Sequence, residues 1–171
     1  MCAADGVAWT LMLEWVPMDV LLKQVHAEQR NWGAYVRPPA RPENLQALTD
    51  QVRRVLGAEL PHGYLDFLAQ SDGLDFDGLV IYDSASSPEQ RTEGFWQGFV
   101  YTNLAWRDDP TNRELLIFGD SDMDLFIQHI NTGAFRRVDK IAHDRFEVFP
   151  SFEVMLEAAL RARMRAGSAA G

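Results

Sequence analysis

Closely spaced carboxylates are the residues of this 171-residue chain that are best suited to chemistry. Asp120, Asp122 and Asp124 alternate along the sequence, as do the first ligands of an EF-hand calcium loop. The sixth position of such a loop would be Leu125 where glycine is required, and the twelfth would be Asn131 where a bidentate glutamate is required. We therefore expect no metal at this loop and predict a turn that leads into a strand.

Other catalytic patterns are incomplete. The four histidines are scattered, and none has a second ligand at a spacing typical of a zinc site; they are His26, His62, His129 and His143. The sequence holds no phosphate-binding glycine loop, dinucleotide fingerprint or serine nucleophile elbow. Paired carboxylates could still serve a small hydrolase, because spacing alone does not distinguish a glycosidase pair from a solvated acidic rim. We expect a protein that is not an enzyme and needs no cofactor.

The negative charge is concentrated in the middle third of the chain. Residues 72–124 carry 12 acidic and 3 basic side chains, whereas the flanking segments hold 13 of each, and the formal net charge is −9. Such a field repels the nucleic acid backbone and speeds the encounter with basic partners. Turn residues that are kept polar for solubility would give the same composition.

Carboxylates of this middle third, together with one tryptophan, form the predicted partner-binding surface. A large aromatic side chain among charges is typical of an interface anchor, although packing in the core is the common alternative for tryptophan. The predicted residues are Asp72, Asp75, Asp77, Asp83, Trp96, Asp108, Asp109, Asp120, Asp122 and Asp124.

Apolar residues at helical spacing predict helices near both ends of the chain. They cover residues 17–31, 42–56 and 152–166, and Gly57 supplies the left-handed residue that ends the second helix. Residues 60–68 form a shorter amphipathic turn. Between the helices, β-branched and aromatic segments predict strands at residues 79–82, 114–118, 125–130, 134–138 and 146–149.

This order of elements predicts a single α+β domain, in which N-terminal helices and a C-terminal helix pack on an antiparallel sheet of about four to six strands. Residues 95–106 fit either a strand or a helix. The domain would cover residues 17–166, after an N-terminal arm of residues 1–16 and before a flexible tail of residues 167–171.

The apolar segment of residues 7–16 is not expected to direct the chain to a membrane. It holds only ten residues including Glu14, and Asp5 stands ahead of it where a signal peptide has basic residues. Cys2 is the only cysteine, which excludes a disulfide framework and fits a reducing compartment. We expect a cytoplasmic protein without a transmembrane helix. The sequence leaves its oligomeric state open.

A series of loose motifs gives the chain a recognisable outline. They are Leu60-Pro61, Tyr64, Phe67 and Leu68, Asp72-Gly73, Gly78 with the strand at 79–82, Asn103 and Trp106, residues 116–119 and 120–126, Thr132-Gly133 and residues 149–152. In these motifs and their order, over residues 18–165, the chain resembles the SUKH superfamily, the Smi/Knr-like proteins, and particularly its YrhA-like branch. Residues 1–16 lie outside the resemblance.

The resemblance implies helices around an antiparallel sheet and no shared catalytic residues. In bacteria it commonly implies an immunity protein, which binds and neutralises a polymorphic toxin, often a nuclease, that is delivered between competing cells. The leading hypothesis is such an immunity protein, whose acidic surface meets the basic active-site cleft of its cognate toxin without contacting nucleic acid or membrane itself. Alternatives are a non-catalytic regulatory or scaffold module with another basic protein partner, and the small hydrolase.

Overall fold

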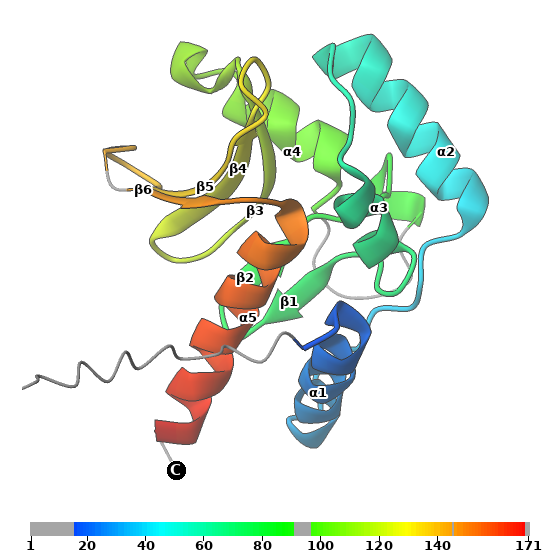
Figure 1. Cartoon of the computed structure of the whole chain (residues 1–171). Coiled ribbons are helices and arrows are strands. Elements are labelled where there is room, and N and C mark those ends of the chain that lie inside the picture. Colours follow the sequence, from blue (N-terminus) through cyan, green and yellow to red (C-terminus); the bar gives the residue numbers. More distant parts are fainter. Residues whose placement is uncertain (1–15, 91–96, 145, 170–171) are drawn as a thin grey trace, which may run out of the picture.

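A six-stranded meander forms the centre of the molecule (Figure 1). The computed structural model describes residues 16–90, 97–144 and 146–169. Every strand pairs antiparallel with the strand before it in the chain, so the sheet order equals the sequence order. The strands are β1 (Leu74–Phe76), β2 (Leu79–Ile81), β3 (Leu115–Asp120), β4 (Asp124–His129), β5 (Phe135–Asp139) and β6 (Phe146–Phe149).

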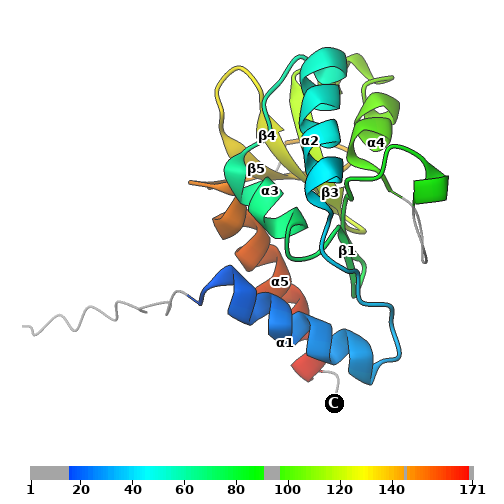
Figure 2. The ribbon, with the colours of Figure 1, turned by 90° about the vertical axis from the view of Figure 1, so that its right-hand side faces the viewer.

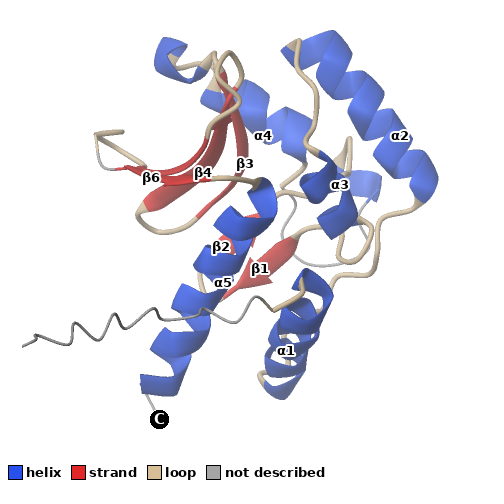
Figure 3. Ribbon diagram, viewed as in Figure 1, coloured by secondary structure: helices blue, strands red, loops and turns tan. Residues whose placement is uncertain are grey.

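The described part of the chain holds five α-helices, which pack on this sheet and on one another (Figure 3). Helix α4 runs beside β3, α5 packs against β2, β5 and β6, and α1 packs against α5 (Figure 2). The helices are α1 (Met18–Asn31), α2 (Pro42–Gln51), α3 (His62–Leu68), α4 (Phe99–Trp106) and α5 (Phe152–Ala169). The prediction of a single α+β domain with an antiparallel sheet is confirmed.

Aromatic side chains join the layers in the core. The ring centroid of Tyr64 in α3 lies 5.2 Å from Phe99 in α4, 5.0 Å from Phe118 in β3 and 5.3 Å from Phe152 in α5. The four rings are at most 1% exposed. Aromatic pairs at these separations add to the free energy gained from burial alone. The amphipathic turn that the sequence predicts around Tyr64 is therefore the point where strand β3 and three helices meet.

Most predicted elements occur close to their expected bounds. The second helix comprises α2 and a π-helical turn over Val52–Leu56, and Gly57 ends it with φ of 66°. The ambiguous segment at residues 95–106 contains α4. In the described part of the chain, no helix has both the length and the apolar composition of a membrane span.

Two expectations about the elements were incomplete or wrong. No strand is expected from the sequence before residue 79, yet β1 pairs with β2 across a two-residue turn. Asp77 and Gly78 form this turn with φ of 48° and 76°, the left-handed values of a type I′ hairpin. Helix α5 continues to Ala169, three residues beyond the helix end expected at residue 166. The predicted N-terminal arm, apart from Val16, lies outside the described residues.

Candidate partner-binding surface

The structure distributes the predicted surface residues over separate places. Trp96 lies outside the described residues. Of the nine carboxylates, Asp72, Asp83 and Asp120 are turned inward, and Asp108 and Asp109 follow α4. The remaining four, Asp75, Asp77, Asp122 and Asp124, lie near one end of the sheet and are called the acidic rim below.

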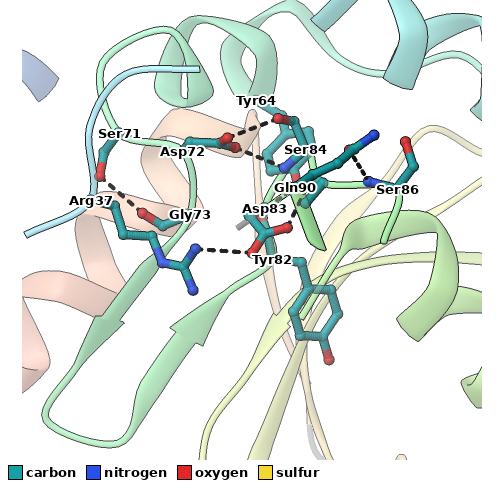
Figure 4. Close-up of polar contacts among 11 residues, drawn as sticks. Arg37, Tyr64, Ser71, Asp72, Gly73, Tyr82, Asp83, Ser84, Ser86 and Gln90 are labelled. Atoms are coloured by element: carbon teal, nitrogen blue, oxygen red, sulfur yellow. Dashed lines mark hydrogen bonds and ion pairs between the residues drawn. The ribbon is translucent and has the colours of Figure 1, made fainter. Parts of the chain in front are cut away.

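Asp83 is part of a buried ion pair (Figure 4). The side chain is 2% exposed, and its Oδ2 accepts a hydrogen bond from Nη1 of Arg37 at 3.0 Å. Its other oxygen accepts from the backbone N–H of Ala85 at 3.0 Å. A buried carboxylate needs such partners, because removing an ionised group from water without compensation is costly. Asp83 is therefore fixed by the fold and is not an exposed contact.

Asp72 lies beside this ion pair and is satisfied by Ser84. It accepts hydrogen bonds from the Ser84 backbone N–H at 2.7 Å and from the Ser84 hydroxyl at 2.9 Å (Figure 4). Burial raises the pKa of the Asp72 carboxyl, while the two Ser84 bonds and the charge of Arg37 oppose that shift. Arg37, Asp72, Asp83 and Ser84 are called the polar cluster below.

The polar cluster borders a groove of about 430 Å³. Its lining also includes Tyr35, Pro38, Arg41 and Gln90. Both signs of charge are present along the walls, so the groove has no single electrostatic preference. Within the described ranges, no three His, Cys, Asp or Glu side chains converge in a way that could hold a metal ion.

Asp120 connects the core to the turn between β3 and β4. Its Oδ2 accepts a hydrogen bond from the Tyr82 hydroxyl at 2.7 Å, and its Oδ1 lies 3.5 Å from Nζ of Lys140. The Tyr82 hydroxyl in turn accepts from Nε1–H of Trp106 at 3.0 Å. Burial, followed by the nearby charge of Asp120, raises the pKa of Tyr82. The Asp120 carboxylate is thus part of a hydrogen-bonded chain that reaches α4.

The acidic rim arises from the pairing of β2 with β3. Val80 lies opposite Asp120, which brings the β1–β2 and β3–β4 turns to the same end of the sheet. A methyl group placed on Gly78 would lie 3.6 Å from Oδ2 of Asp122. Asp77 and Asp122, which are 45 positions apart in the sequence, consequently belong to one exposed edge, and Arg163 of α5 reaches the same place.

Asp108 and Asp109 occupy the exposed segment after α4. Asp109 caps the short 3₁₀ turn that follows, accepting from the backbone N–H of Thr111 at 2.9 Å and its hydroxyl at 2.8 Å. These bonds lower the pKa of Asp109, and the charge of His143 lowers it further. The segment is therefore within electrostatic reach of the β5–β6 turn, which holds His143.

Several features of this region are not predicted from the sequence. The Asp77-Gly78 pair directly before the apolar run at 79–82 is a turn signal that could have revealed β1 and the rim. No local signal could have revealed the pair of Arg37 and Asp83, since 46 positions separate them.

The sequence was compared with family models and with curated proteins. No protein-family model matches the chain, and no curated protein sequence matches it significantly. The resemblance to the SUKH superfamily therefore remains a prediction that rests on the sequence motifs.

Proposed function

We propose that this protein is a bacterial immunity protein that binds a cognate polymorphic toxin in the cytoplasm and neutralises it by stoichiometric contact, without catalysis. The observation that carries the proposal is the acidic rim, where two turns from distant parts of the sequence present carboxylates at one end of the sheet. The expected partner is a toxin domain with a basic active-site cleft, as in a nuclease or a nucleotide-using enzyme. The SUKH-like motifs support the same function.

The chemistry of the rim suits binding of a basic cleft. Asp75, Asp77 and Asp122 are exposed, in contrast to the carboxylates of the polar cluster, and they outnumber Arg163, the cation that reaches the same edge. Exposed charges of one sign steer an oppositely charged protein and raise the association rate by roughly 10- to 1000-fold at low salt. The effect decays over about 8 Å at physiological ionic strength, so it should weaken as salt is added.

A rescue experiment tests the proposal. A candidate toxin domain is first sought among the open reading frames next to the gene; it is then co-expressed with the chain, and growth is followed with and without the chain. In parallel, binding of the purified proteins is measured at several salt concentrations. We expect restored growth, a tight complex and an association rate that falls steeply with salt. Binding without restored growth would instead support the regulatory or scaffold alternative.

A matched pair of variants locates the binding charge. One variant converts the four rim residues Asp75, Asp77, Asp122 and Asp124 to Asn. The control converts four exposed acids elsewhere, Asp19, Glu43, Asp50 and Asp66, to the corresponding amides, so that the net charge changes equally. Slower association in the first variant alone would support the rim, whereas equal slowing in both would reduce its role to that of general net charge.

A further inference from the structure

Two large apolar side chains stand in the turns beside the acidic rim. Ile141 is 91% exposed and Met123 is 64% exposed, the highest fractions among the large hydrophobic side chains in the described ranges. Met123 lies in the turn between β3 and β4, flanked in sequence by Asp122 and Asp124. Ile141 lies in the turn that follows β5.

The backbone holds these two turns against one another. The N–H of Lys140, the residue before Ile141, donates to the carbonyl oxygen of Met123 at 2.8 Å. The Asp139 carboxylate closes its own turn by accepting from the N–H groups of Ile141 at 2.9 Å and Ala142 at 2.7 Å. Both apolar residues therefore stand on a base whose conformation is fixed before any partner arrives, which lowers the entropy lost on binding.

The exposure of this pair contributes nothing to folding. Tight turns favour Gly, Pro, Asn, Asp and Ser, and an apolar side chain in water forgoes the free energy of burial. A single exposed apolar residue is ordinary on a protein surface. Here two of them occupy turns joined by a backbone hydrogen bond, and the charged residues next to them in the sequence are Asp122, Asp124 and Lys140. An apolar centre with a charged border is the arrangement found at interface hot spots.

We propose that Met123 and Ile141 are the apolar anchor of the partner-binding surface and insert into an apolar hollow bordered by Arg or Lys on the toxin domain. The inference rests on the proposed function, which supplies the class of partner. Charge complementarity selects a basic protein as the occupant. A second copy of the chain would place like-charged carboxylates against one another, with a net charge of −9 on each copy.

The test measures association and dissociation rates against the purified toxin domain that the rescue experiment identifies. The variants are Met123→Ser and Ile141→Ser, and the control is Leu104→Ser, which truncates an aliphatic side chain on α4 that is 44% exposed. Each anchor variant should weaken binding about tenfold or more through faster dissociation. Association rates and their salt dependence should hardly change, because no charge is removed. The melting temperatures of both anchor variants should stay close to that of the wild type, whereas Leu104→Ser should lower it slightly, because part of this helical side chain is buried.

The outcomes separate the anchor from the proposed function. If the wild-type chain binds and protects while both anchor variants dissociate as slowly as it does, the anchor is wrong and the proposed function stands. If Leu104→Ser dissociates as fast as the anchor variants, the effect is not specific to these turns and the anchor is again wrong. If the wild-type chain neither binds nor protects, the proposed function fails and the inference fails with it.

Discussion

The carboxylates of the polar cluster and those of the acidic rim come from the same middle third of the sequence, but they differ in burial and in hydrogen bonding. Asp72 and Asp83 flank the open end of the β1–β2 hairpin, where the connector with Arg37 covers them. Asp77 closes the other end, and the side chains of Asp122 and Arg163 border its neighbour Gly78. Identical side chains are thus engaged by the fold at one end of a hairpin and left to solvent at the other.

The difference shows that acidic composition alone does not define a binding surface. A carboxylate that already accepts hydrogen bonds in a buried site can contact a partner only if those bonds break, which costs free energy. A carboxylate on a turn has no such cost. The number of acids that can serve a partner is therefore smaller than the sequence suggests, and stability measurements should sort the two groups.

The largest effect is expected when the ion pair of the polar cluster is broken. Arg37→Met leaves the buried carboxylate of Asp83 without its guanidinium, and removing one partner of a buried pair costs about 3–5 kcal/mol. Urea denaturation followed by circular dichroism gives the free energy of unfolding. The double variant with Asp83→Leu should lose much less, because no uncompensated charge then remains. Equal losses in the single and double variants would contradict this account.

Tyr82→Phe should have the next largest effect and tests the boundary between the two regions. It removes the hydroxyl that donates to Asp120 and accepts from Trp106. Leaving these partly buried groups without that partner should cost about 1–3 kcal/mol in unfolding free energy. Asp122→Asn, two residues along the same turn, is the matched control. A loss as small as that of the control would assign Asp120 to the rim.

The pH dependence of stability should reveal Asp72. Burial raises the pKa of this carboxyl in the folded protein, so the folded state holds the proton more tightly than the unfolded state does. Its contribution to the free energy of unfolding is complete below the ordinary pKa of 3.8 and falls as pH rises toward the raised folded value. Subtracting the curve of Asp72→Asn from that of the wild type should therefore give a downward slope above pH 3.8. An upward slope would mean that the Ser84 hydrogen bonds outweigh desolvation.

The smallest effects on stability are expected at the rim itself. Asp77→Asn and Asp122→Asn should each change the free energy of unfolding by less than about 0.5 kcal/mol, because both side chains are exposed. Asparagine also tolerates the positive φ of 48° at position 77. Asp77→Val is the contrasting variant, and it should cost about 1–2 kcal/mol because a β-branched residue is strained there. A large loss from Asp122→Asn would show that the rim is part of the fold.

Most helices and strands could be predicted from the sequence because the patterns that indicate them are local. Helical spacing of apolar residues located α1, α2 and α5, and the Thr132-Gly133 turn with its flanking apolar segments located the β4–β5 hairpin. The segment of α4 stayed ambiguous because it is apolar on most sides, so that no single face stands out before the sheet is placed. Strand β1 was missed because it has only three residues. Their order of buried, exposed and buried side chains is too short to stand out as a periodic pattern.

For the candidate site, the sequence determines the composition but not the arrangement. The excess of carboxylates between residues 72 and 124 can be counted in the sequence, and the Asp-Gly turn that places Asp77 can be recognised there. Which carboxylates are buried was decided by tertiary structure, because Arg37 and Lys140 come from outside that segment. The exposure of Met123 and Ile141 was decided in the same way, since an apolar residue is buried or solvated according to what the rest of the chain packs against it.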